Sequence, residues 1–257
     1  MALSDSTTRF SDRVDNYVKY RPSYPTTLID YLEETRRLNR RAVIADIGSG
    51  TGKLSEVFLE QGYPIIGIEP NNEMREAGES LLADYLKFES MDGTAETTGL
   101  PRNSCDLIIC GQSFHWFNIP QTRVDWQRIL SPNGWVALIW NERDTQSAFL
   151  SDYKSFLRIH AKSYSEVNHR NIDTALIERF CTPNPLEISE FPNHQLFDFP
   201  SLLGRYMSSS YAYTAGDPKL DNAVKALRAL FEMLQVNDRV RFEYRTRIYS
   251  GQLPIAE

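Results

Sequence analysis

One segment, residues 42–70 (AVIADIGSGTGKLSEVFLEQGYPIIGIEP), constrains the fold more than any other part of the chain. Residues 43–47 are mostly apolar and predict a short buried strand, which a glycine-rich turn follows. Apolar residues then recur at helical spacing until Gly62 ends the helix. A second apolar run, residues 65–68, predicts another buried strand with Glu69 at its end. This strand–turn–helix–strand unit is half of a doubly wound nucleotide-binding fold.

The spacing of the glycines narrows the choice of ligand. A dinucleotide-binding turn reads G-x-G-x-x-G, whereas Gly48, Gly50 and Gly52 give G-x-G-x-G, and Lys53 stands where that pattern has its third glycine. Asp46 precedes the first glycine; its carboxylate would repel a pyrophosphate and attract a ligand that carries an ammonium and a sulfonium. We therefore predict S-adenosylmethionine rather than NAD as the cofactor. Asp46 has a second possible role, which is to orient the turn.

Other residues of this unit complete the predicted cofactor site. Glu69 follows Gly48 by about 20 residues, the spacing at which an acid reaches ribose hydroxyls, and a carboxylate can accept hydrogen bonds from both. Gly48, Ser49 and Gly50 bring bare backbone close to the amino-acid end of the cofactor. The cofactor's own carboxylate suits the N-terminus of the following helix, where unpaired N–H groups favour an anion.

Three motifs, ADIGSGTG, GIEPNNEM and GTAETTGLPRNSCDLIICGQSFHWF, resemble the class I S-adenosylmethionine-dependent methyltransferases. Within that family they are most similar to the small-molecule branch that includes the trans-aconitate methyltransferase-like proteins. The likeness covers roughly residues 42–141, and YVKYRPSYP, SSSY and RFEYRTRIYSGQL extend it weakly in both directions. The resemblance implies an enzyme that uses S-adenosylmethionine to methylate a small molecule.

The resemblance also implies roles for individual residues. Thr94 stands where the adenine loop of the family often begins with Asp, which leaves the adenine hydrogen bond open and lets Glu96 pair elsewhere. An N-terminal arm rich in tyrosine is expected to close over the cofactor, the alternative being an arm packed on the edge of the sheet. The further cofactor residues implied in this way are Tyr17, Arg21, Pro70, Met74, Thr94, Ala95, Glu96 and Gln112.

Five residues are candidates for the acceptor site: Tyr20, His115, Trp116, Arg143 and Arg205. His115 is the candidate catalytic residue, as a general base or as a group that orients the acceptor; a structural histidine is the alternative. The two arginines suit an acceptor with a carboxylate, because a guanidinium can make two parallel hydrogen bonds to it. Both arginines could equally be surface residues.

Composition excludes several classes of protein. The chain has 257 residues and a net charge of −6, which argues against nucleic acid as its main partner. No apolar run approaches the length of about 18 residues that spans a membrane, and the beginning of the chain has no apolar core typical of a secretory signal. Three scattered cysteines fit a reducing cytoplasm, and the dispersed histidines predict no metal site.

The predicted architecture is a single α/β methyltransferase domain with a doubly wound, mostly parallel seven-stranded sheet. Its last strand, residues 240–248, alternates apolar and polar residues and is expected to be antiparallel. We expect Asp217 and Pro218 to cap a helix over residues 220–234, and residues 195–199 to form the sixth strand. The expected parts are an arm or lid (1–25), a cofactor-binding core (26–141), a helical insertion after the fifth strand (142–191) and the C-terminal part of the sheet (192–257).

Three functions remain in competition at this level. The first is methyl transfer to a small molecule, with a carboxylic acid among the candidate acceptors. The second is a nicotinamide-dependent oxidoreductase, against which Asp46 and the glycine spacing argue. The third is a non-catalytic module that binds S-adenosylmethionine.

Overall fold

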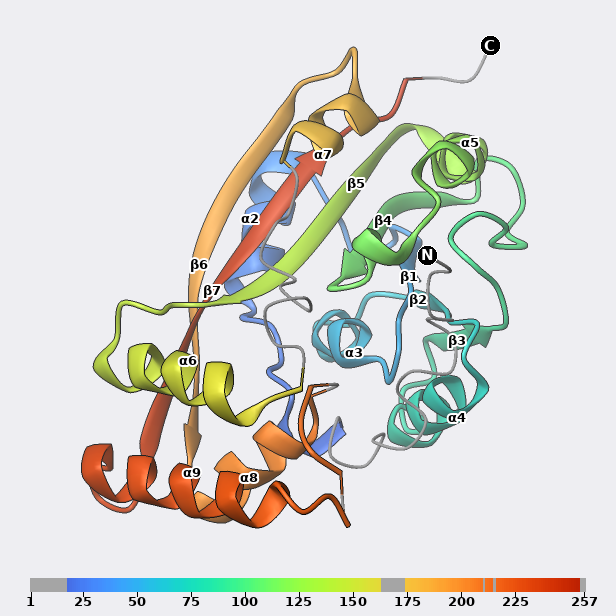
Figure 1. The fold of residues 1–257 in the computed structure, drawn as a ribbon. Helices are drawn as coiled ribbons and strands as arrows, with labels where there is room; N and C mark the ends of the chain where they lie inside the picture. The colour runs from blue at the N-terminus through green and yellow to red at the C-terminus, as the bar shows by residue number, and fades with distance from the viewer. Residues whose placement is uncertain (1–17, 163–173, 210, 215, 255–257) are drawn as a thin grey trace.

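The computed structural model describes residues 18–162, 174–209, 211–214 and 216–254 (Figure 1). The predicted cofactor residue Tyr17 lies outside these described residues. Within them the chain forms one seven-stranded sheet in the order β3-β2-β1-β4-β5-β7-β6, which confirms the predicted fold class. The strands are β1 (Ile44–Ile47), β2 (Ile65–Ile68), β3 (Phe88–Met91), β4 (Cys105–Gly111), β5 (Leu130–Arg143), β6 (Leu186–Phe197) and β7 (Val240–Gly251).

Neighbouring strands from β3 across to β5 run parallel, whereas β7 is antiparallel to both β5 and β6. The direction of strand succession reverses beside β1, and this switch point is where open α/β sheets bind ligands, at the carboxyl ends of the strands. The helices are α2 (Thr27–Arg36), α3 (Lys53–Glu60), α4 (Asn72–Leu81), the 3₁₀ turn η2 (Phe114–Trp116), α5 (Ile119–Ile129), α6 (Ala148–His160), α7 (Thr174–Cys181), α8 (Phe199–Met207) and α9 (Leu220–Leu234).

The parallel strands are apolar on both faces because helices cover both. In β4, Leu107 and Ile109 pack with residues of α2 and α3, while Ile108 and Cys110 pack with residues of α5 and α7. Successive side chains along a strand point to opposite faces of the sheet, so a strand without polar residues is buried on both faces. The strand predictions at residues 43–47, 65–68 and 106–110 succeed for this reason.

A second apolar cluster lies beyond the carboxyl ends of the parallel strands. We call it the helical lobe: α6, α8, α9, the segment 211–214, the end of β6 and the beginning of β7. Figure 1 shows these helices gathered at one end of the two long strands β6 and β7, which run on past the parallel part of the sheet. The lobe is unusually aromatic, with Tyr153, Tyr206 and Phe242 among its fully buried side chains. It therefore stands over the edge of the sheet where a ligand is expected.

Strand β6 differs from the prediction. It begins at Leu186, inside the segment expected to be a helical insertion, and pairs with β7 over its whole length to Phe197. An edge strand can carry a proline, because one side of it needs no ladder hydrogen bonds, and Pro192 lies in the middle of β6. Proline and a mostly exposed side-chain pattern hid this strand from a search based on buried runs.

Two further boundaries also differ. Helix α9 begins at Leu220 without a side-chain cap; Asp217 instead accepts a hydrogen bond from the backbone N–H of Lys219 at 3.0 Å, in the turn before the helix. The sequence Pro132-Asn133-Gly134 is typical of a turn, but these residues lie within β5, where the pairing with β4 shifts register between Leu130 and Trp135.

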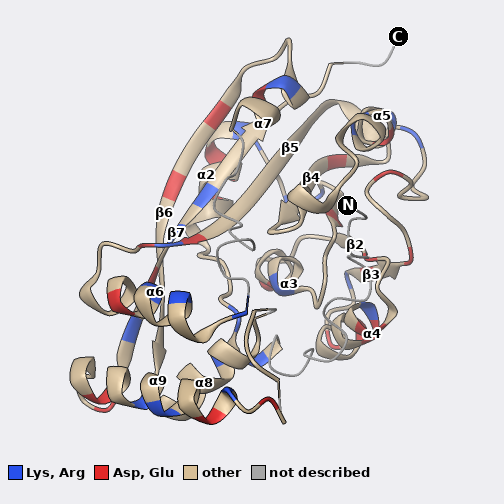
Figure 2. Ribbon diagram, in the orientation of Figure 1, with Lys and Arg blue, Asp and Glu red and all other residues tan. Residues whose placement is uncertain are grey.

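Charged side chains strengthen the pairing of β6 with β7 on the outer face. Arg247 contacts both Glu190 and Glu142, and Arg245 contacts Glu190 and Asp144. Figure 2 shows the acidic positions of β6 beside the basic positions of β7. In the part of the chain that the structure describes, no helix is long and apolar enough to cross a lipid bilayer.

Candidate functional site

The glycine-rich turn after β1 adopts a backbone that other residues rarely tolerate. Gly48, Gly50 and Gly52 have φ angles of 70°, 59° and 77°, in the left-handed region that favours glycine. A Cβ atom on Gly48 would lie 2.6 Å from Ser113 Oγ, whereas on Gly50 its nearest neighbour would be the flexible Cε of Met74, at 3.3 Å. Packing against Ser113 therefore fixes Gly48, whereas a Cβ on Gly50 would press on the flexible end of the Met74 side chain.

Glu69 is held at the carboxyl end of β2 by backbone groups. Its Oε2 accepts a hydrogen bond from the Gly50 N–H at 2.9 Å, and its Oε1 accepts one from the Asn71 N–H at 2.9 Å. Burial raises the pKa of this carboxyl, against the opposing effects of these two bonds and of Arg75. Each carboxylate oxygen keeps capacity for a further donor, so both ribose hydroxyls could still bind.

Asp46 is buried behind the same turn, with 1% of its surface exposed. Its Oδ2 accepts a hydrogen bond from Ser55 Oγ at 2.6 Å, and its Oδ1 has no hydrogen-bond partner among the described residues. Burial raises the pKa of Asp46 to about 7, and the nearby charge of Glu69 adds to this. The hydrogen bond from Ser55 joins the end of β1 to α3 behind the turn, and both roles considered for Asp46 stay predictions.

The side chain of Met74 lies against the glycine turn from the first turn of α4. Asn71 caps this helix by accepting the Met74 N–H at 2.8 Å, a role for which asparagine is favoured. Met74 is buried and its Cε faces Gly50, while Pro70 is half-buried at the end of β2. The two residues predicted to flank adenine thus adjoin Glu69 and the turn.

The loop after β3 is held by its own contacts. Thr94 and Thr97 pair through their backbones, and Ala95 is buried in the core. The Oε1 of Glu96 accepts a hydrogen bond at 2.7 Å from the N–H of Asn118, the residue before α5. This is the alternative pairing expected for Glu96, so its carboxylate already has a backbone partner.

Gln112, directly after β4, has a strained backbone at the sheet's ligand edge. Its φ of 64° is rare for a residue with a side chain. Its N–H donates to Ile139 O at 3.0 Å and its Nε2 donates to Asn141 O at 3.3 Å. Strain of this kind persists where surrounding contacts enforce it and is frequent at functional sites.

His115 and Trp116 lie together in η2, one turn beyond Gln112. Their ring centroids are 4.7 Å apart at 43°, with His115 exposed and Trp116 half-buried. The structure thus brings both residues to the carboxyl end of β4, on the side where the acceptor was predicted.

The arm residues Tyr20 and Arg21 contact the helical lobe. A Cβ atom on Gly204 of α8 would overlap the ring of Tyr20, at 2.0 Å from its nearest carbon, and Arg21 Nη2 donates to Ser208 O at 3.1 Å. Arg21 also contributes to lowering the pKa of Tyr211. These contacts place Arg21 against the lobe, and the cofactor contact predicted for it stays a prediction.

Tyr24 is a site residue that the sequence prediction did not single out. A Cβ atom on Gly111, the last residue of β4, would lie 2.6 Å from the Tyr24 hydroxyl. The tyrosine therefore covers the carboxyl end of β4, next to Gln112. Its place in YRPSYP showed only that the arm is aromatic, and nothing local to the sequence indicated which tyrosine reaches the sheet.

Arg205 is buried inside the helical lobe, with 5% of its surface exposed. Its Nε donates to Tyr244 OH at 3.4 Å, and its Nη1 donates to Ser208 Oγ at 3.4 Å and Ser209 Oγ at 3.3 Å. Its guanidinium also lies 5.6 Å from the ring centroid of Phe242. None of these partners among the described residues is a carboxylate, so a buried cation is solvated only by hydroxyls and a ring. Arg205 is not the surface residue that was the alternative.

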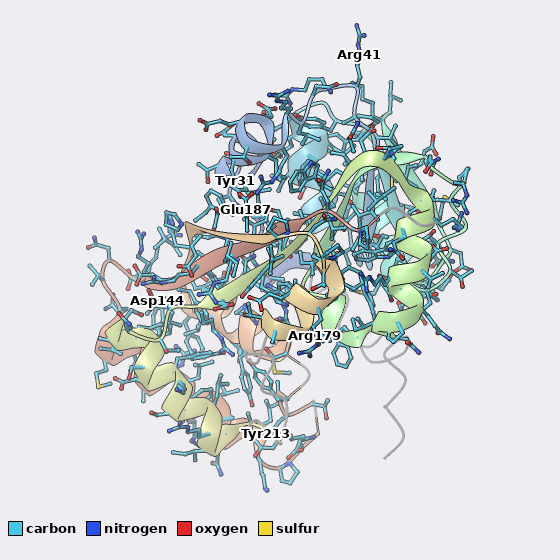
Figure 3. The ribbon with its side chains drawn as sticks, turned by 90° about the horizontal axis from the view of Figure 1, so that it is seen from above. Tyr31, Arg41, Asp144, Arg179, Glu187 and Tyr213 are labelled. Carbon is cyan, nitrogen blue, oxygen red and sulfur yellow. The ribbon has the colours of Figure 1, made fainter. Side chains whose placement is uncertain are left out.

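Arg143, at the end of β5, adjoins the same cluster. Its guanidinium lies 5.9 Å from the ring centroid of Tyr153, whose buried hydroxyl has no hydrogen-bond partner among the described residues. Burial alone would raise the pKa of Tyr211, yet Arg143 and Arg205 together lower it to about 8. Figure 3 labels Asp144, the residue after Arg143, and Tyr213, and both lie on the side of the molecule that carries α6. The two predicted acceptor arginines therefore act on one group of tyrosines.

Comparison with known proteins shows which family the parallel half of the sheet matches. Residues 45–138 match the family described as methyltransferase domain, a stretch that holds the glycine turn, Glu69 and Gln112. These residues form a class I S-adenosylmethionine-dependent methyltransferase domain. The nicotinamide-dependent alternative finds no support in this match, and the trans-aconitate branch stays a prediction.

Relatives of this methyltransferase domain extend the comparison. An uncharacterized methyltransferase of Schizosaccharomyces pombe is 34% identical over 52% of this chain and 53% of its own length. The chain spans about half the length of the curated relatives it matches. A structure described as a type II methyltransferase of Anaeromyxobacter dehalogenans has the same fold, with a TM-score of 0.67 at 20% identity over 91% of this chain and 99% of that one. A phosphoethanolamine N-methyltransferase of Haemonchus contortus, solved with S-adenosylhomocysteine, gives a TM-score of 0.55 at 13% identity over 97% of this chain and 59% of its own.

S-adenosylmethionine is the cofactor of this methyltransferase domain, and the described residues fit it. Glu69 keeps acceptor capacity for two hydroxyls, Gly50 has no side chain between its backbone and the Met74 methyl group, and Asp46 keeps an unused buried oxygen behind the turn. In the described ranges no group of three His, Cys, Asp or Glu residues could hold a metal ion.

Proposed function

We propose that this chain transfers the methyl group of S-adenosylmethionine to a small molecule that carries a carboxylic acid. The observation that supports this acceptor is the buried Arg205, which lacks a carboxylate partner among its described contacts and shares a tyrosine cluster with Arg143. Burying a cation without a counter-ion is costly, so a site of this kind favours an anionic ligand. An arginine also matches a carboxylate by two parallel hydrogen bonds.

The proposed division of labour follows the two halves of the molecule. The bound cofactor supplies an electrophilic methyl group on its sulfonium. Glu69 holds the ribose of the cofactor, and the backbone at Gly50 contacts its amino-acid end. Gln112 and Tyr24, at the carboxyl end of β4, lie beside the methyl group that is transferred. Arg143 and Arg205 hold the acceptor from the lobe. Orientation of this kind can lower a barrier by up to about 7–11 kcal/mol, because it replaces a bimolecular encounter.

The proposal requires no strong general base. A carboxylic acid is ionised at neutral pH and is already a nucleophile. His115 and Trp116 then orient the acceptor rather than remove a proton from it, which agrees with the exposed position of His115 after β4. Tyr20, packed on α8 beside Arg205, would line the acceptor side.

The test is a transfer assay with methyl-tritiated S-adenosylmethionine and pairs of small molecules, each acid matched by its neutral amide. Acids should accept label and their amides should not, and the labelled product should release methanol in mild alkali, as a methyl ester does. A product stable to alkali would contradict the ester. Cofactor binding with no acceptor in the panel or in metabolite extracts would favour the non-catalytic module.

A further inference from the structure

Two side-chain amides converge on one backbone carbonyl of the N-terminal arm. Ser23 O accepts a hydrogen bond from Asn193 Nδ2 at 2.8 Å and another from Asn141 Nδ2 at 3.2 Å. Asn141 belongs to β5 and Asn193 to β6, two strands that β7 separates. The arm is not part of the sheet, so these bonds contribute nothing to strand pairing and fasten the arm across three strands.

Asn141 has a second set of contacts that belongs to the sheet alone. Its Oδ1 accepts a hydrogen bond from Thr246 Oγ1 at 2.5 Å and one from Asn193 Nδ2 at 3.1 Å. Thr246 is fully buried and lies opposite Asn141 in the β5–β7 register. The oxygen of the Asn141 amide therefore serves the sheet, while its nitrogen serves the arm, and the two functions can be separated by substitution.

Asn141 also contacts Gln112, at the edge of the sheet where the cofactor is predicted to bind. Asn141 O accepts a hydrogen bond from Nε2 of Gln112, the residue with the left-handed backbone at the end of β4. The residue that follows Ser23 is Tyr24, whose hydroxyl covers Gly111 directly before Gln112. Asn141 is thus linked to both Gln112 and Tyr24. Its backbone carbonyl accepts the hydrogen bond from Gln112, and its side chain holds the arm at Ser23, the residue before Tyr24.

On its other side the arm reaches the helix that carries the acceptor arginine. The ring of Tyr20 packs on Gly204, and Arg21 donates to Ser208 O, so the arm contacts the residues on both sides of Arg205. The Gln195 side chain donates to Tyr20 O at 3.4 Å and accepts from Tyr244 OH at 2.9 Å, the same hydroxyl that Arg205 contacts. The segment from Tyr20 to Tyr24 therefore connects the cofactor edge with the lobe, and Ser23 is its fastened point.

We propose that Asn141 and Asn193 are positioning residues for methyl transfer: their amides clamp the arm at Ser23, so that Tyr24 and Gln112 border the cofactor while Arg205 faces the acceptor. This assignment rests on the proposed function for its catalytic consequence. The clamp itself is a property of the arm and is measurable without an acceptor. Because the clamp couples the arm to the cofactor edge, S-adenosylhomocysteine should protect the arm only when both amides are intact.

The test compares three variants with the wild-type protein. Asn141→Asp keeps an oxygen for Thr246 and places a second oxygen, which cannot donate, against Ser23 O. Asn193→Ala removes the other donor. Thr246→Val is the matched control, because it removes the hydrogen bond on the sheet side of Asn141 and leaves both bonds to the arm.

The first readout is limited trypsin cleavage after Lys19, with and without S-adenosylhomocysteine. The ligand should slow cleavage of the wild-type and Thr246→Val proteins at least fivefold and should leave the Asn141→Asp and Asn193→Ala proteins unprotected. Protection of the two asparagine variants equal to wild type would overturn the clamp. Equal loss in Thr246→Val would overturn it too, because the sheet rather than the arm would then be responsible.

The second readout is catalysis with an acid found in the acceptor panel. Asn141→Asp should lower kcat at least tenfold with a smaller change in the KM for S-adenosylmethionine, and Thr246→Val should stay within twofold of wild type. A kcat unchanged in Asn141→Asp would overturn the positioning role. If no acceptor exists, the proposed function fails, whereas the cleavage experiment still decides the clamp.

Discussion

We propose that the parallel half of the sheet and the helical lobe recognise their ligands with different chemical groups. Around β1, β2 and β4, recognition depends on backbone geometry: left-handed glycines, N–H groups that hold Glu69, and the strained Gln112. In the lobe it depends on buried side chains, above all Arg205 among hydroxyls. Backbone recognition needs a short motif in one stretch of sequence, whereas the lobe assembles its site from α6, α8, β5 and β7.

The difference also separates the expected effects of substitution. Changes at the turn should remove cofactor binding and leave the lobe folded. Changes at Arg205 should remove acceptor binding and leave the cofactor site intact. Each substitution that follows alters the site in one half of the molecule, and the measurement checks whether the site in the other half changes.

The largest effect is expected for Gly50→Val. A β-branched side chain would press on Met74 Cε, which would lie 3.3 Å from its Cβ, and strain a backbone with φ of 59°, so affinity for S-adenosylhomocysteine should fall by more than about 100-fold. Gly62→Val is the matched control, because Gly62 also has a positive φ, of 82°, yet a Cβ there would meet nothing within 4 Å. The control should lose thermal stability only. Calorimetric affinity equal to wild type in a folded Gly50→Val protein would contradict the role of the turn.

Arg205→Met should affect the lobe alone. Loss of one partner of a buried charge pair typically costs 2–5 kcal/mol, so kcat/KM for the acceptor should fall by about 10²-fold or more. Affinity for S-adenosylhomocysteine should stay within twofold, and stability should be equal or higher, because a buried cation has been replaced by an apolar chain. Arg228→Met, at an exposed position over Phe199, is the control. A matching loss of cofactor affinity in Arg205→Met would contradict the separation of the two halves.

Asp46→Asn should weaken cofactor binding and should raise the stability of the folded protein in a pH-dependent way. The pKa of Asp46 is raised from 3.8 to about 7 by burial, so the folded protein holds a proton that the unfolded chain loses between about pH 4 and pH 7. Stability contributed by this site therefore falls as pH rises through that window. At pH 8 the variant should melt several degrees above wild type, at about 2–4 °C per kcal/mol, and the gap should close toward pH 5. A melting-temperature difference independent of pH would refute this account of Asp46.

The sequence predicted the parallel half well because its signals are local. Apolar runs of four or five residues, the spacing of Gly48 and Gly50, and an acid after β2 lie within one short stretch. Of strand β6 only the end was predicted, at residues 195–197, because its earlier part contains Pro192 and no buried run. The clamp at Ser23 could not be predicted either, since Asn141 and Asn193 are brought together only by pairing with β7.

Arg21 shows what its place in the arm could not indicate. The sequence predicts a cofactor contact for it, which stays a prediction, whereas its hydrogen bond to Ser208 O and the packing of Tyr20 on Gly204 depend on α8, which is remote in sequence. The pair of acceptor arginines was predicted from positions after β5 and before an aromatic–serine stretch. That the two act on one tyrosine cluster follows from the lobe's packing and from nothing in the sequence.

The central claim is that Glu69 and the glycine turn form a cofactor site that works independently of the lobe. The most direct measurement is calorimetric titration of S-adenosylhomocysteine into the wild-type, Glu69→Ala and Arg205→Met proteins, with Glu79→Ala as an exposed control on α4. We expect one site per chain, a loss of about 1.5–3 kcal/mol in Glu69→Ala, the scale of hydrogen bonds to a charged group, and unchanged affinity in the other two. Absence of binding to the wild-type protein, or wild-type affinity in Glu69→Ala, would contradict the claim.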